Sequence, residues 1–184
     1  NFDGTEGGLA ADGNSELWTY TLPAVADVDL TLGTELPLQD LSAGTFKQVT
    51  DTPASRVPRA GSTTVAPFFA DDNRDPAISD DGKVIAFIST RNLVPGVGNT
   101  DANPELFFYN VITGSFTQAT HTQDPTPGIG LVFQASPSLS TDGTVVAFMS
   151  SANLANNNAD GNAEIYVANF SGGAVSNIAR SHAR

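Results

Sequence analysis

Three copies of an Asp-x-Asn-x-Glu triplet carry the side chains best suited to chemistry in this 184-residue sequence. They are Asp12/Asn14/Glu16, Asp101/Asn103/Glu105 and Asp160/Asn162/Glu164. Oxygen atoms at positions i, i+2 and i+4 resemble the opening of a calcium loop, because a hard cation prefers carboxylate and amide oxygens. The triplets therefore predict Ca²⁺ sites.

A second interpretation of the triplets stays open. The glycine at the sixth position and the glutamate at the twelfth position of an EF-hand loop do not follow any copy. Asp, Gly and Asn are favoured turn residues, so each triplet could be a polar turn that enters a strand. Under that interpretation its Glu faces solvent and binds no cation.

Catalytic residues are not predicted. The sequence has two histidines, His121 and His182, and no Gly-x-Ser-x-Gly nucleophile motif accompanies them. Four of the eight basic residues lie in or beside one connection and could bind an anion or a partner, or simply pair with surplus carboxylates: Arg56, Arg59, Arg74 and Arg91. We expect a protein that is not an enzyme.

Internal repetition identifies the elements that must position the triplets. Residues 75–89 and 136–150 are copies of one pattern, in which a short strand, an Asp-Gly turn and an apolar strand follow one another. This pattern predicts a β-hairpin, because Gly supplies the positive φ of a tight turn. A triplet, a third strand and a Thr-rich fourth strand come next, so the repeat unit has four strands.

Tandem four-stranded antiparallel units indicate a β-propeller, whose radial repetition protects strand edges. We predict an all-β chain of about two and a half blades forming a single β-propeller-like domain over residues 1–184. Its parts are a half blade at 1–50, with an insertion at 23–44, and blades at 75–120 and 136–179. The insertion could cover a sheet edge or form a hairpin.

The motif Pro-x-Ile/Leu-Ser-x-Asp-Gly-x-x-Val/Ile-Ala-Phe, at 76–87 and 137–148, resembles the TolB-like (WD-like) β-propeller repeat of bacterial exported proteins. The loops at 92–96 and 153–157 resemble the loop between the second and third strands in that family. The resemblance covers roughly 75–180 and part of 10–50. It implies a bacterial protein of the periplasm or the extracellular space.

The chain departs from that family in size. Two and a half blades cannot close a ring, and repeat units need neighbours to bury their apolar faces. We therefore expect a longer chain or an assembly with further copies. Because the half unit lacks its first two strands, those strands would come from another segment or subunit.

Composition narrows the classes of partner. The net charge of −12 repels phosphate backbones, so nucleic-acid binding is not expected, and no apolar stretch is long enough for a membrane span. Cysteine is absent, which excludes disulfides. The first hypothesis is a non-enzymatic exported module for protein interaction or self-assembly. The alternatives are a calcium-dependent surface protein that binds a glycan or partner, and a propeller fragment of a larger hydrolase or lyase.

Overall fold

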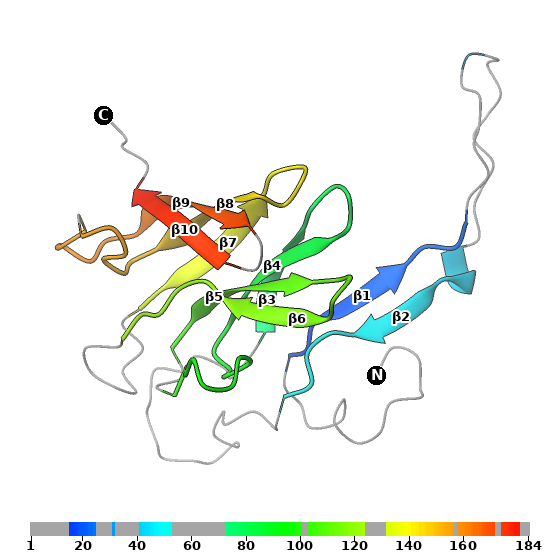
Figure 1. Cartoon of the computed structure of the whole chain (residues 1–184), viewed down its shortest axis with the longest axis horizontal. Coiled ribbons are helices and arrows are strands. Elements are labelled where there is room, and N and C mark those ends of the chain that lie inside the picture. Colours follow the sequence, from blue (N-terminus) through cyan, green and yellow to red (C-terminus); the bar gives the residue numbers. More distant parts are fainter. Residues whose placement is uncertain are drawn as a thin grey trace, which may run out of the picture.

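The computed structural model describes residues 15–24, 31, 41–52, 73–100, 103–123, 132–156, 158–171 and 174–180. These residues form three antiparallel sheets (Figure 1). The strands are β1 (Trp18–Thr21), β2 (Thr45–Gln48), β3 (Asn73–Ile78), β4 (Val84–Ser89), β5 (Glu105–Asn110), β6 (Ser115–Gln118), β7 (Gln134–Leu139), β8 (Val145–Ser150), β9 (Glu164–Ser171) and β10 (Ala174–Arg180). A turn of 3-10 helix, η3 (Leu41–Ala43), precedes β2.

Two of the sheets are four-stranded meanders with the orders β3-β4-β5-β6 and β7-β8-β9-β10. We call them the first blade and the second blade. The third sheet pairs only β1 with β2, and we call it the half blade. The all-β prediction of four-stranded propeller blades is thus confirmed, and the described sheets do not close into a ring. No helix among the described residues has the length and apolarity needed to cross a membrane.

The two Asp-Gly hairpins form as predicted. Gly82 and Gly143 both have a φ of 69°, the left-handed conformation that such a turn requires. In the first turn, Asp81 Oδ1 accepts hydrogen bonds from Ser79 Oγ (2.7 Å) and from the amide of Lys83 (3.1 Å). The Lys83 side chain and these bonds lower the pKa of Asp81 to about 2. Asp142 makes the same kind of turn in the second blade.

The apolar core is divided between the two junctions of the array. Between the half blade and the first blade, Leu17 packs against a cluster that includes Phe87 and Phe107. Between the two blades, Phe108 of β5 stacks on Phe170 of β9, with ring centroids 4.1 Å apart. Alternate residues of one strand thus face opposite neighbours, as period-two side-chain alternation requires.

The first strands of the two blades are bulged at the same place. Asp75 and Ser136 have φ values of 53° and 52°, and the strand register shifts beside each of them. The amide of Ser136 donates to Asp75 Oδ2 at 3.3 Å, so one bulge contacts the other. Arg74 donates to the carbonyl of Gln134 at 3.2 Å in the same region. The bulges therefore help to join β3 to β7.

Candidate interaction site

The triplet glutamate of the first blade lies inside a blade junction. Glu105 is the first residue of β5 and is 1% exposed, so it does not face solvent as the polar-turn interpretation required. Its Oε1 accepts hydrogen bonds from the amide and the hydroxyl of Thr122, the latter at 2.8 Å. Its Oε2 accepts from the hydroxyl of Thr120 and from Nε2 of Gln134, at 3.0 Å. One carboxyl group therefore joins β5, the end of β6 and the start of β7.

Further hydrogen bonds extend this network. The hydroxyl of Thr120 accepts from the amide of Leu106 at 2.9 Å, and Gln134 Nε2 also donates to the carbonyl of Pro104 at 2.8 Å. The side chain of Asn103, two residues before Glu105, donates to the carbonyl and the hydroxyl of Thr122. We call this arrangement the glutamate latch.

Burial dominates the electrostatics of the latch. Desolvation raises the pKa of Glu105 to about 7, although the hydrogen bonds from Thr120, Thr122 and Gln134 act in the opposite direction. The carboxyl group therefore changes its charge near neutral pH, which is unusual for a glutamate.

The half blade contains a second latch of the same design. Glu16 Oε1 accepts from the amide and the hydroxyl of Thr52, at 2.8 and 2.6 Å, and Oε2 accepts from Asn73 Nδ2 at 3.2 Å. The amide of Leu17 donates to the hydroxyl of Thr50 at 2.7 Å. Asn73 opens β3 as Gln134 opens β7, so each latch reaches the first residue of the next blade.

The third triplet has different surroundings. Glu164 opens β9 and is partly exposed, and the residue in the place of Thr120 is Ala179. Asn162 Nδ2 donates to Asp160 Oδ2 at 3.0 Å on the exposed surface. The remaining triplet residues, Asp12, Asn14 and Asp101, lie outside the described residues.

Calcium binding at the triplets stays a prediction. Within the described part of the chain, no group of three or more His, Cys, Asp or Glu side chains is placed to hold a metal ion. Sequence reasoning missed Thr50, Thr52, Thr120 and Thr122, and the amides of Asn73 and Gln134. The repeated Thr-x-Thr segments at 50–52 and 120–122 were the available signal.

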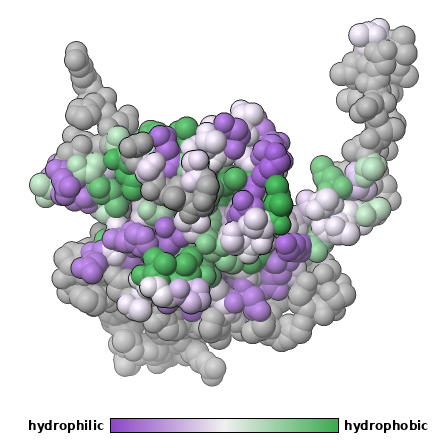
Figure 2. Space-filling view, viewed as in Figure 1, coloured by the Kyte–Doolittle hydropathy of each residue, from purple (hydrophilic) through white to green (hydrophobic). Residues whose placement is uncertain are grey.

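The half blade projects from the two blades (Figure 1). In the first blade β5 pairs with both β4 and β6, whereas its counterpart β1 pairs, among the described strands, with β2 alone. Phe46 on β2 is 39% exposed and Leu22 after β1 is 56% exposed. Figure 2 shows hydrophobic residues where the half blade leaves the body. The apolar surface of the half blade is therefore only partly covered.

Two cavities lie at equivalent places in the junctions. The one between the two blades has a volume of about 780 Å³ and is lined in part by His121, Thr122 and Asn158. The one beside the half blade has a volume of about 540 Å³ and includes Arg91 and Asn99. His121 is exposed, and no hydrogen bond joins its imidazole to a hydroxyl group within the described residues. His182 lies outside them.

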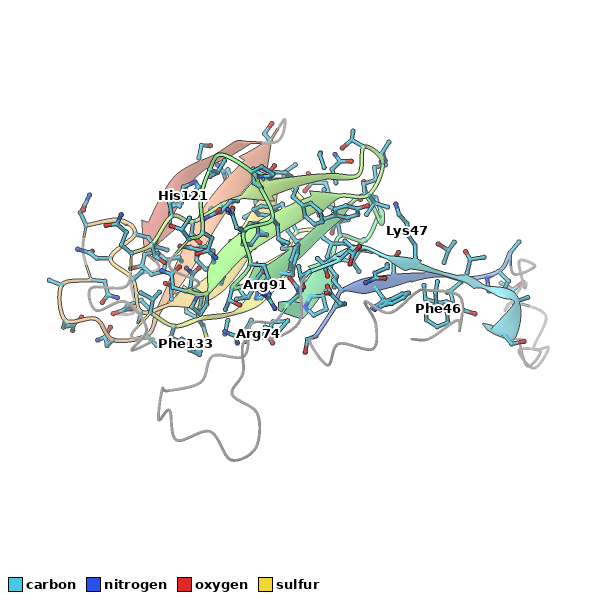
Figure 3. All side chains as sticks on the ribbon, turned by 90° about the horizontal axis from the view of Figure 1, so that it is seen from below. Phe46, Lys47, Arg74, Arg91, His121 and Phe133 are labelled. Atoms are coloured by element: carbon cyan, nitrogen blue, oxygen red, sulfur yellow. The ribbon has the colours of Figure 1, made fainter. Side chains whose placement is uncertain are left out.

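Two of the four arginines, Arg74 and Arg91, lie within the described residues. Arg74 lies 3.5 Å from the Asp75 carboxylate, which is the pairing with carboxylates that the sequence left open. Arg91 is buried beside the half blade, and Figure 3 places both arginines far from Phe46. Arg56 and Arg59 lie outside the described residues.

No family model and no curated protein matches the chain. Among solved structures, it is similar to TolB from Acinetobacter baumannii, with 23% identity and a TM-score of 0.42 over 74% of this chain and 24% of that one. A protein from Agrobacterium tumefaciens assigned as TolB has 20% identity and a TM-score of 0.41 over 75% of this chain and 35% of that one. The β-propeller domain of the Trilobed protease from Pyrococcus furiosus has 14% identity and a TM-score of 0.38, over 62% and 30%.

These structural neighbours, TolB and a β-propeller domain, are of the kind that the repeat motif predicted. The chain spans about a quarter to a third of their lengths. Because these TM-scores are below 0.5, we assign the fold from the sheets and their registers and not from the neighbours.

Proposed function

We propose that the chain is a non-enzymatic β-propeller module that binds protein partners through exposed apolar side chains of its second blade. One observation carries this proposal: Ile165 and Val145 are 44% and 37% exposed, although the corresponding residues of the first blade, Leu106 and Val84, are buried. Contiguous apolar surface that is exposed in this way marks a site of protein interaction.

The strand register makes this apolar surface continuous across β8 and β9. Ile165 pairs with Met149 and Val167 pairs with Ala147, and directly paired residues share a side of the sheet. All four are apolar and at least partly exposed.

The composition of this surface favours a protein ligand. The side chains of Ile165, Met149, Val167 and Ala147 supply apolar area and carry no group that would hydrogen-bond a sugar hydroxyl. We propose a protein ligand rather than a glycan on this basis.

The resemblance of the hairpins to the TolB-like repeat supports a bacterial protein of the periplasm or extracellular space. A role as part of a larger hydrolase or lyase is the alternative, and the sequence of the complete gene would test it.

A photo-crosslinking amino acid at position 165, in the protein expressed in its source cells, tests the proposal. We expect discrete crosslinked protein adducts from position 165. The matched control places the same amino acid at position 112, because Ile112 is 72% exposed in a turn outside this surface, and it should give no adduct. The same pattern of adducts from both positions, or no adduct from position 165, would refute the proposal.

A further inference from the structure

We propose that the cavity between the two blades binds a small uncharged molecule with an apolar body and an amide or hydroxyl donor. Its volume of about 780 Å³ lies within the range of about 300–1,000 Å³ that is typical of pockets for small ligands. The residues of the apolar surface around Ile165 are not among the described residues that line it. The inference is therefore independent of the proposed protein interaction.

One part of the cavity wall is apolar. Ala119 is 7% exposed and belongs to the core cluster between the blades. Leu154 and Ile178 pack against that cluster and are themselves only partly buried, and all three residues line the cavity. Leu154 comes from the loop between β8 and β9, and Ile178 comes from β10. A ligand in the cavity therefore buries its apolar body beside the core of the junction, and this burial supplies affinity.

The polar part of the wall is nearly free of charge. It includes Thr122, Gln123 and Asn153, and no Asp, Glu, Lys or Arg is among the described residues that line the cavity. This is a marked difference from the whole chain, which has 20 acidic and 8 basic residues. His121, which is exposed, is the one titratable side chain in the described part of the wall. A charged ligand would lose hydration here without gaining a counterion, so the wall favours an uncharged one.

Asn158 adds a hydrogen-bond acceptor to this wall. It is 2% exposed and lines the cavity. Its Nδ2 donates to the carbonyls of Ser151 and Asn162, at 3.2 and 2.9 Å, and these two bonds fix the orientation of the side-chain amide. Its Oδ1 accepts no hydrogen bond from the residues that the structure describes. A buried acceptor without a donor is costly, and an N–H or O–H group of a ligand would satisfy it.

The repeat builds the same arrangement a second time, in the cavity of about 540 Å³ beside the half blade. Asn99 lines that cavity and is 4% exposed. Its Nδ2 donates to the carbonyl of Asn103 at 3.0 Å, as that of Asn158 does to Asn162. Within the described structure, its Oδ1 also lacks a donor. The acceptor is thus a recurrent feature of the blade junctions.

Charge distinguishes the two cavities. Asp51 and Arg91 line the smaller cavity at the positions that His121 and Ala152 occupy in the larger one. The smaller cavity therefore has charged groups of both signs in its wall. The selectivity for an uncharged ligand belongs to the cavity between the two blades.

Three probes that share a benzene ring test the site in NMR titrations of the unmodified chain at pH 8. Phenylacetamide is uncharged and carries an amide donor, N,N-dimethylphenylacetamide is uncharged and has no donor, and phenylacetate is an anion. We expect phenylacetamide to shift the amide signals of residues 119–123 and 158–161, with a dissociation constant of about 1–10 mM for a ligand of this size. The other two probes should bind about tenfold more weakly, because one leaves Asn158 Oδ1 unpaired and the other must desolvate its charge.

A pair of variants locates the bound probe. Ala152→Trp narrows the cavity that Ala152 lines, so phenylacetamide should bind about tenfold or more weakly. Ala163→Trp is the matched control, because Ala163 is exposed in the same loop and is not among the described residues that line the cavity. This control should bind phenylacetamide as the unmodified chain does.

Three results would overturn the inference: no shift of these signals at ten times the expected dissociation constant, equal binding of the three probes, or equal binding of phenylacetamide by Ala152→Trp and Ala163→Trp. The dispersion of the NMR signals checks that each variant folds. If Ala152→Trp does not fold, the comparison of the three probes on the unmodified chain still decides between the outcomes.

Discussion

Replacing Glu105 by Ala should destabilise the junction between the two blades. The substitution removes an acceptor that receives four hydrogen bonds, two from Thr122 and one each from Thr120 and Gln134. The hydroxyl groups can rotate toward other acceptors, but the amide of Thr122 and one proton of Gln134 Nε2 cannot. A buried donor without an acceptor costs about 1–3 kcal/mol, so the free energy of unfolding should fall by about 3 kcal/mol.

The matched control is Glu164→Ala in the second blade. Glu164 opens β9 as Glu105 opens β5, but it is partly exposed and has Ala179 where Glu105 has Thr120. Substitutions at such positions usually change stability by less than about 1 kcal/mol. The two variants remove the same atoms from equivalent strand positions, so their difference isolates the latch.

Urea unfolding followed by far-ultraviolet circular dichroism measures both variants at pH 6, where Glu105 is largely protonated, and at pH 8. A double-mutant cycle with Gln134→Leu should show coupling between Glu105 and Gln134 at both pH values, because the two side chains are hydrogen-bonded. Equal losses in Glu105→Ala and Glu164→Ala, or additive effects in the cycle, would refute the assignment of Glu105 as a latch.

Three further predictions concern pH, packing and calcium. The pKa of Glu105 is about 7 in the folded state against an ordinary value of 4.5, so the folded state holds the proton more tightly than the unfolded state. The free energy of unfolding should therefore fall by about 3 kcal/mol as the pH rises from 4.5 to above 7. The midpoints of urea unfolding should show a smaller fall over this pH range in Glu105→Gln. Gly143→Ala should cost more stability than Gly82→Ala in thermal melts, because both have a φ of 69° but only at Gly143 would the new Cβ come within 2.9 Å of Val84. If Ca²⁺ binds, it should raise the melting midpoint relative to chelator and Glu164→Ala should abolish the rise, whereas no rise would reject the calcium prediction.

Much of the fold could be predicted because its determinants are local. The Asp-Gly turns at 81–82 and 142–143 combine a residue that tolerates positive φ with flanking apolar strands, and these features lie within about ten residues. Repetition then extends each hairpin to four strands, and the two four-stranded sheets agree with that prediction.

The environment of the triplets could not be predicted because its determinants are distant in the sequence. Glu105 meets Thr120 and Thr122 only because β6 folds back on β5, and it meets Gln134 only because the next blade begins beside it. The Asp-x-Asn-x-Glu motif covers five consecutive residues and gives no information about either of these distant contacts. The same motif therefore leads to a buried glutamate at position 105 and a partly exposed glutamate at position 164.

Each latch couples the polar contacts of a junction to its apolar contacts. Glu16 accepts from Asn73, and Glu105 accepts from Gln134, the first residues of the blades that follow them. Leu17 and Leu106, which come directly after these glutamates, are buried in the clusters at the same junctions. Polar and apolar contacts to the next blade are thus made together, so the loss of the Glu105 carboxylate should loosen the packing of Leu106 as well as the hydrogen bonds.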